Sequence, residues 1–169
     1  HRINEDVVLS LISEMLKAAG KTVHLGGNIG CPLLPKVEEI RKDDVAVVEL
    51  SSFQLMTMKK APEVAVVTNV APNHLDVHRD MDEYVAAKRN VFLYQNAAGR
   101  VVLNYENGIT RSFADEAQGN VLFFSKTDIP GDGAYLKDGV IHMRARGEDT
   151  AVLSAADIRI PGMHNVENY

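Results

Sequence analysis

Two short runs of almost uninterrupted apolar residues constrain the fold of this chain more than any other feature. They occupy residues 45–50 and 64–69 and are rich in Val. Strands that are apolar on both faces are typical of the centre of a parallel sheet, where helices cover both sides. Each run is followed by a polar loop. Because ligands of open α/β sheets bind beyond the carboxyl ends of the strands, we expect a ligand site after these runs.

The remaining segments of the first two thirds alternate between helical and extended patterns. Apolar side chains recur at helical spacing over residues 4–19, where Asn4 or Asp6 is a candidate cap and Gly20 follows the end. Further elements are predicted as a strand at 22–25, a helix at 81–94, a strand at 100–104 and a helix at 109–117. This alternation favours an α/β fold.

After residue 119 the pattern changes to short strands separated by Gly and Asp turns. They are predicted at 121–124, 133–137, 140–145 and 150–153. We interpret them as a small, mostly antiparallel β layer in the C-terminal third. The expected fold is therefore one domain over residues 1–169, in which a mostly parallel, doubly wound sheet is flanked by helices.

Composition excludes several classes of protein. The net charge of −5 argues against a broad nucleic-acid surface, and no apolar run approaches the roughly 20 residues that cross a bilayer. Cys31 is the single cysteine, so no disulfide forms within the chain and a reducing compartment is favoured. We expect a cytoplasmic domain with neither a nucleic-acid nor a membrane partner.

Polar residues that follow the two apolar runs are the candidates for chemistry. Glu49 lies near the end of the first run, where a carboxylate suits Mg²⁺ that bridges phosphates, although a solvated strand end is an equally good interpretation. His74 and Asp76 follow the second run and are candidates for a metal or phosphate site. Pattern alone favours an ordinary surface lysine for Lys88 and a tight turn at 26–30.

Five segments, taken in order, resemble the Mur ligase family over roughly residues 9–169. In this sequence they read Gly-Asn-Ile-Gly at 27–30, Glu-Leu-Ser-Ser-Phe-Gln-Leu at 49–55, Asn-x-x-x-x-His-Leu-Asp-x-His at 69–78, Tyr-x-x-Ala-Lys at 84–88 and Pro-Gly-x-His-Asn-x-x-Asn at 161–168. The second segment and the glycine-rich first one are most similar to the branch that adds D-glutamate. The resemblance implies the central domain of such a ligase, with a fold like that of P-loop NTPases.

The resemblance also implies a role for eight residues. It makes Glu49, His74 and Lys88 the Mg²⁺ ligands, with His74 and Lys88 counted as catalytic and Lys88 carbamylated. It assigns contacts with the UDP-muramoyl substrate to Asn28, Ser51 and Gln54. It assigns contacts with the adenine side of ATP to Asn165 and Asn168.

The implied reaction is ATP-dependent formation of an amide bond. D-glutamate is joined to UDP-N-acetylmuramoyl-L-alanine through an acyl phosphate, with ATP and Mg²⁺ as cofactors. Two Mg²⁺ ions make physical sense because carboxylate and triphosphate are both anionic. Other partners implied are an N-terminal UDP-binding domain and a C-terminal amino-acid-binding domain, for which 169 residues leave no room.

One departure from the family pattern lies before the first helix. The family has a loop of the form Gly-Thr-Asn-Gly-Lys-Thr-Thr there, whose N–H groups and Lys hold phosphates. Residues 1–8 contain no glycine and place Glu5 at the lysine position. We therefore expect this chain to bind ATP weakly and to lack ligase activity. Three explanations stay open: foreign or altered residues, a degenerate relative, or an omitted segment.

Two rival interpretations stay open as well. One is another Mur ligase branch or a relative of folylpolyglutamate synthetase. The other is a non-catalytic binding domain that has kept the fold and lost the phosphate loop. Residues 1–8 support this second rival, whereas retention of Glu49, His74 and Lys88 argues against it.

Overall fold

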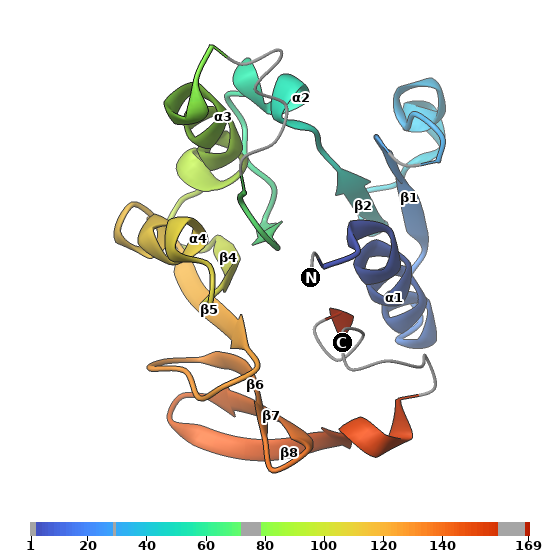
Figure 1. Ribbon diagram of the computed structural model, residues 1–169. Coiled ribbons are helices and arrows are strands. Elements are labelled where there is room, and N and C mark those ends of the chain that lie inside the picture. Colours follow the sequence, from blue (N-terminus) through green and yellow to red (C-terminus); the bar gives the residue numbers. More distant parts are fainter. Residues whose placement is uncertain (1–2, 29, 72–78, 159–167) are drawn as a thin grey trace. The chain divides into compact units, whose positions relative to one another are not determined.

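A computed structural model describes residues 3–28, 30–71, 79–158 and 168–169 of the chain. The chain divides into two compact units, residues 1–51 with 168–169, and residues 52–167 (Figure 1). Each unit is considered by itself below.

The first unit contains one helix packed on a pair of parallel strands. Helix α1 contacts both strands, and the strands pair in register from Val23 opposite Val45 to Gly27 opposite Glu49. The predicted helix, the strand before the glycines and the first apolar run are thus confirmed. The elements of this unit are α1 (Glu5–Ala18), β1 (Val23–Gly27), the 3₁₀ turn η1 (Leu34–Glu39) and β2 (Val45–Glu49).

The ends of α1 follow the rules for helix caps. The Asn4 side chain accepts a hydrogen bond from the Val7 N–H at 3.3 Å, and so Asn4 is the cap. Glu5 and Asp6 in the first turn carry negative charge that interacts favourably with the positive end of the helix dipole. Gly20 lies two residues past the last helical residue and has a φ of 81°. Glycine adopts this left-handed conformation without the steric cost that other residues have, which explains why a glycine occupies the position.

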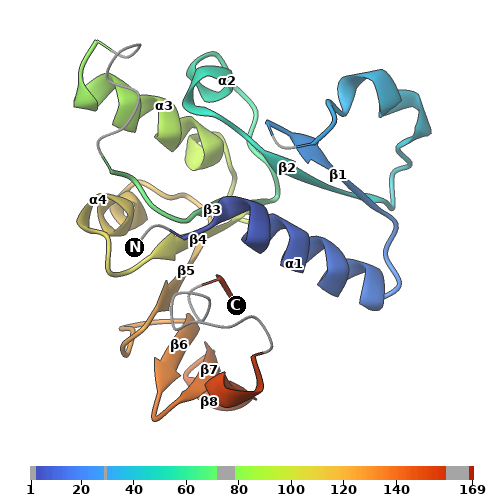
Figure 2. The same cartoon turned by 45° about the vertical axis from the view of Figure 1, so that its right-hand side comes forward.

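The second unit is built on one six-stranded sheet with strand order β3-β4-β5-β6-β7-β8 (Figure 2). Neighbours from β3 to β6 are parallel, and β6, β7 and β8 are antiparallel. Its elements are α2 (Ser52–Met56), β3 (Val64–Val67), α3 (Met81–Leu93), β4 (Arg100–Asn104), α4 (Gly108–Ser112), η2 (Phe113–Asp115), β5 (Asn120–Ser125), β6 (Gly133–Lys137), β7 (Val140–Ala145), β8 (Glu148–Ser154) and η3 (Ala155–Asp157).

The core of the second unit lies where α3 and α4 pack on β3 and β4. Phe92 from α3 and Phe113, just after α4, have their ring centroids 5.4 Å apart and are almost completely buried. Val101 and Leu103 are the inward residues of β4, each with 0% exposure. On β3 the inward residues Ala65 and Val67 are buried, whereas Val64 and Val66 on the other face are 49% and 39% exposed. The second apolar run is therefore an edge strand buried on one face, and the expectation of a central strand buried on both faces was wrong for it.

The structure confirms the predicted mixed α/β class, with a mostly parallel sheet and antiparallel strands in the C-terminal part. One detail differs: β5, predicted within the antiparallel layer, is parallel to both β4 and β6. The last strands therefore extend the same sheet. Gly133 enables the β5–β6 pairing, because it has a φ of 144° and a Cβ there would collide with the Phe123 carbonyl.

Among the helices in the described part of the chain, none is long and apolar enough to cross a membrane.

Candidate functional site

Glu49 lies at the carboxyl end of β2, as its place in the sequence predicted. Its side chain is half-buried, and its backbone carbonyl accepts a hydrogen bond from the Asn28 N–H at 3.0 Å. The exposed Asn28 therefore comes next to Glu49 at the edge where β1 and β2 both end. The structure thus brings together one predicted metal ligand and one predicted substrate contact.

Gly27 makes the close approach of these two strand ends possible. Its φ is 107°, and a Cβ on it would collide with the carbonyl oxygen of Glu49. The close backbone approach at Gly27 is thus to the neighbouring strand, and an approach of these glycines to a ligand stays a prediction. Ile29 of this segment lies outside the described residues.

Two hydrogen bonds to one carboxylate fix the chain before β2. Asp44 accepts hydrogen bonds from the Arg41 N–H at 3.0 Å and from the His24 ring at 2.9 Å. The Arg41 N–H first, and the His24 ring second, hold the pKa of the Asp44 carboxyl below its usual value. Because Asp44 immediately precedes β2 and His24 belongs to β1, this contact ties the start of one strand to the other.

Lys88 lies on α3, half-buried, with its Nζ 6.0 Å from the ring centroid of Tyr84 one turn earlier. The helix itself is well anchored. Asp80 caps its start by accepting from the Glu83 N–H at 2.9 Å, a bond that lowers the pKa of Asp80. Asn90 donates to the Leu55 carbonyl of α2 at 2.9 Å. Lys88 therefore extends from a helix that is capped at its start and bonded to α2, which suits a residue that must present a group at a fixed place.

The other predicted site residues have separate positions. Ser51 is half-buried in the first unit, whereas the exposed Gln54 belongs to α2 of the second unit. His74, with Asp76, and Asn165 lie outside the described residues.

Asn168 is 7% exposed, and its Oδ1 accepts a hydrogen bond from the Asn4 N–H at 3.1 Å. This contact joins the end of the chain to the start of α1 within the first unit. At least one atom of the side chain predicted to contact adenine therefore has a structural use.

The predicted Mg²⁺ ligands are only partly described. Within residues 3–28, 30–71, 79–158 and 168–169, no three His, Cys, Asp or Glu side chains gather as a metal site would require. Glu49 offers one carboxylate, a ligand type that fits Mg²⁺. The ammonium of Lys88 fits a cation only after carbamylation turns it into an anion. Glu49 belongs to the first unit and Lys88 to the second. That Glu49, His74 and Lys88 bind Mg²⁺ together stays a prediction.

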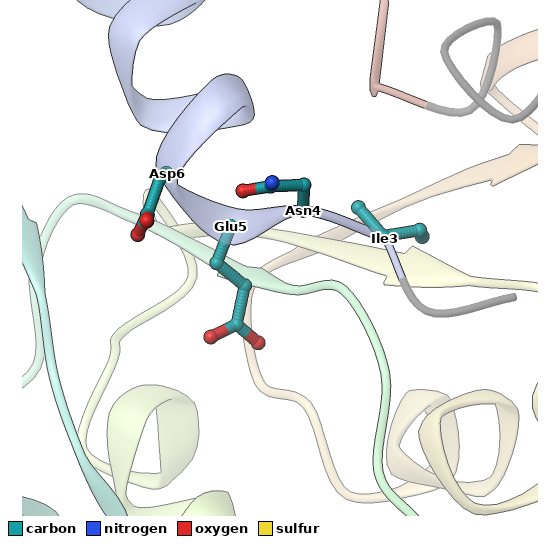
Figure 3. A pocket seen from close by; sticks show the side chains of 4 residues that line it. All are labelled: Ile3, Asn4, Glu5 and Asp6. Carbon is teal, nitrogen blue, oxygen red and sulfur yellow. The ribbon is translucent and has the colours of Figure 1, made fainter. Parts of the chain in front are cut away.

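A pocket of about 320 Å³ is found at the start of α1, next to the position where the resemblance implies a phosphate loop. Among the described residues, Ile3, Asn4, Glu5 and Asp6 line it (Figure 3). Figure 3 shows the carboxylates of Glu5 and Asp6 projecting from the first turn of the helix.

This pocket does not fit a triphosphate. A helix start binds phosphate through free N–H groups and positive charge. Here the Val7 N–H donates to Asn4 and the Asn4 N–H donates to Asn168, so these two donors already have acceptors. Glu5 and Asp6 would also repel an anion. The residues present therefore argue against nucleotide phosphates at this helix start.

A group of asparagines at the ends of β3 and β4 was not anticipated from the sequence. The Asn104 amide donates to the Thr68 carbonyl at 3.0 Å, and the Asn107 amide donates to Asn69 at 2.7 Å. Both bonds join residues that follow one parallel strand to residues at the end of the next. A possible signal was the recurrence of Asn at or just after two neighbouring apolar strands, which is where an α/β sheet binds ligands.

The polar residues Glu49, Asn69 and Asn104 lie at or just after the carboxyl ends of parallel strands, which is where α/β sheets bind ligands. The model of the family described as Mur ligase middle domain matches residues 8–169. The chain therefore belongs to the Mur ligase middle domain family. The match begins after the residues that line the pocket, Ile3 to Asp6.

Curated relatives of high identity bear one name. The chain is 57% identical over 160 residues to UDP-N-acetylmuramoylalanine–D-glutamate ligase of Acetivibrio thermocellus, and 51% identical over 160 residues to the same-named protein of Clostridium beijerinckii. Each alignment covers 95% of this chain and 34% of the relative. The chain thus spans about a third of the length of these relatives.

Solved structures support the fold. A UDP-N-acetylmuramate:L-alanyl-gamma-D-glutamyl-meso-diaminopimelate ligase from Neisseria meningitides matches 95% of this chain and 54% of its own, with a TM-score of 0.65 and 18% identity. A murein peptide ligase from Psychrobacter arcticus matches 98% of this chain and 40% of its own, with a TM-score of 0.62 and 14% identity.

Proposed function

We propose that the protein to which this chain belongs is an ATP-dependent carboxylate–amine ligase that adds D-glutamate to UDP-N-acetylmuramoyl-L-alanine in peptidoglycan precursor synthesis. The single observation that carries this proposal is the 57% identity to a D-glutamate ligase over 95% of the chain. Residues 1–169 are then its central domain, and an N-terminal UDP-binding domain and a C-terminal amino-acid-binding domain are its partners in the same protein.

The proposed site residues keep the roles that the family resemblance implies. Glu49, His74 and carbamylated Lys88 hold Mg²⁺, whose positive charge screens the repulsion between a carboxylate and a phosphate. Their placement is supported for Glu49 by its position at a parallel strand end, and for Lys88 by the anchored helix α3. Asn28, Ser51 and Gln54 contact the UDP-muramoyl substrate in this proposal. Asn165 and Asn168 contact the adenine side of ATP.

The proposed site of action is the cytoplasm. The nucleotide substrates and the single Cys31 support this location, since a lone cysteine needs no oxidising compartment.

We further propose that the 169-residue chain alone binds Mg-ATP weakly and has no ligase activity. The support is the start of α1, where Asn4 and Asn168 accept the N–H groups of Val7 and Asn4, and where Glu5 and Asp6 add negative charge.

Phosphate release by the full-length protein tests the ligase proposal. With UDP-N-acetylmuramoyl-L-alanine, ATP and Mg²⁺ present, release should depend on an added amino acid, and D-glutamate should be preferred. Release with a different amino acid, and none with D-glutamate, would favour another Mur ligase branch or a folylpolyglutamate synthetase relative.

A second candidate function is a non-catalytic binding domain. The observation that favours it is the start of α1, where the N–H groups of Val7 and Asn4 already have acceptors within the protein. The same assay separates the two. A full-length protein that releases no phosphate with any amino acid, yet still binds the UDP-muramoyl substrate, would support the non-catalytic domain.

A further inference from the structure

The side-chain amide of Asn107 has its orientation fixed by the backbone. Asn107 caps α4, and its Oδ1 accepts hydrogen bonds from the N–H groups of Ile109 at 3.1 Å and Thr110 at 3.0 Å. Backbone N–H groups only donate, so the atom that faces them must be the oxygen. The other amide atom is therefore Nδ2. Its 3.0 Å contact with the Val70 carbonyl, which only accepts, leads to the same conclusion.

This assignment fixes Asn69 in turn. The Asn107 Nδ2 lies 2.7 Å from a side-chain atom of Asn69, and a donor requires an acceptor there, so that atom is Oδ1. The Asn69 Nδ2 and its two hydrogens must then point away from Asn107. Within the described part of the chain, no acceptor for this Nδ2 is found. Asn69 is half-buried and follows β3 by two residues.

Asn104 shows that a free amide is not a general property of this edge. Its Nδ2 donates to the Thr68 carbonyl at 3.0 Å, and its Oδ1 accepts from the Glu106 N–H at 2.9 Å. Both ends of Asn104 are thus used within the protein, as are both ends of Asn107. Asn69 is the member of the group that is held by its oxygen and whose donors have no acceptor among the described residues, at the carboxyl end of a parallel strand where ligands bind.

We propose that the Asn69 amide binds an anionic oxygen of the substrates, phosphoryl or carboxylate, and that Asn107 is the positioning residue that keeps the donors turned outward. Carboxylate and phosphoryl oxygens accept hydrogen bonds from N–H groups, and a donor held in advance costs no reorganisation when it binds an oxyanion. The part of this inference that concerns turnover rests on the proposed ligase function. The binding of an anion does not.

The variant N69D in the full-length protein tests the donor role. Asp is the same size, and one of its oxygens still accepts from Asn107, so the described contact of residue 69 is kept while both donors are lost. We expect turnover to fall about 100-fold, the scale measured for loss of one oxyanion donor, with an unchanged melting temperature. Wild-type turnover in N69D would overturn the proposal.

The variant N107D tests the positioning role while Asn69 is left intact. Asp still caps α4, but its second oxygen now faces Asn69, which must turn its Nδ2 inward to donate and its oxygen outward. We expect kcat to fall at least 10-fold at a temperature where the variant is fully folded. A purely structural role predicts a lower melting temperature with kcat unchanged in the folded protein, which would overturn the positioning role.

N96D is the matched control in the same unit. The Asn96 Oδ1 accepts from the Ala98 N–H at 2.9 Å in the loop before β4, at the opposite end of the sheet from Asn69. Turnover should stay within twofold of wild type. A loss equal to that of N69D would mean that any Asn-to-Asp change harms the enzyme, and the proposal would fall.

A binding measurement separates this inference from the proposed function. In the ¹⁵N-labelled chain, the side-chain amide signals of Asn69 should shift saturably on titration with inorganic phosphate or acetate, and those of Asn96 should not. A response to phosphate alone identifies a phosphoryl site, and a response to acetate alone a carboxylate site. An inactive full-length protein whose Asn69 signals still shift would refute the ligase proposal only. The absence of a shift with both anions would overturn the anion site.

Discussion

Helices α1 and α4 both begin with an asparagine cap, and yet the two helix starts have opposite properties. Asn4 and Asn107 each accept from backbone N–H groups of the following turn. At α1 the cap is followed by Glu5 and Asp6, and the Asn4 N–H is itself bound by Asn168. At α4 the first turn has no acidic residue, and the Nδ2 of the cap residue Asn107 donates to Asn69 and so orients its amide.

The difference teaches that a cap residue does not determine whether a helix start serves a ligand. The same side-chain chemistry closes the start of α1 to anions and arranges donors beside α4. The two caps differ in their neighbours. The cap of α1 is followed by the carboxylates of Glu5 and Asp6, whereas the cap of α4 contacts Asn69 and Val70, which follow the parallel strand β3.

The largest expected effect concerns the core on which α4 rests. Phe113 is 1% exposed and packs on Phe92 at 5.4 Å, so F113A should lower the free energy of unfolding by about 3–5 kcal/mol. Chemical denaturation measures this loss. M143A, at a side chain with 52% exposure on β7, is the control and should change stability by no more than about 0.5 kcal/mol. Equal effects would mean that α4 does not rest on a specific core.

A smaller effect should separate the two caps. N4A removes one capping bond from the start of α1 and should cost about 1 kcal/mol. N107A removes two accepted N–H bonds and two donated bonds, and should cost about 2–3 kcal/mol. Urea unfolding of both variants gives the comparison. A cost for N4A equal to or above that of N107A would refute the more integrated role assigned to Asn107.

The elements and the site differ in how far the sequence could predict them. The helix at 4–19 with its Asn4 cap, the two apolar strands and the end position of Glu49 follow from local pattern, and the structure confirms them. The direction of β5 does not follow, because parallel and antiparallel pairing depend on partners far along the chain. The contact between Asn69 and Asn107 spans 38 residues, and no local pattern records it.

The smallest expected effect uses a third cap, Asp80 of α3, which carries a charge. The Glu83 N–H holds the pKa of Asp80 below its usual value of 3.8. A lowered folded pKa means that the stability from this cap is full above pH 3.8 and is lost as pH falls through the folded pKa. Between pH 6 and pH 3, wild type should therefore lose more stability than D80N.

Unfolding of the two proteins in urea at each pH measures this difference. N4D and N107D should add a similar pH dependence to caps that now have none. Parallel curves for wild type and D80N would show that Asp80 makes no special contact in the folded protein.

The most direct test of the contrast between the two helix starts is calorimetric titration of the 169-residue chain with Mg-ATP. The closed cap and the two carboxylates at the start of α1 predict no heat of binding at micromolar nucleotide. A dissociation constant in the micromolar range would contradict the account, because it would require the start of α1 to accept the triphosphate that Asn168, Glu5 and Asp6 are argued to exclude.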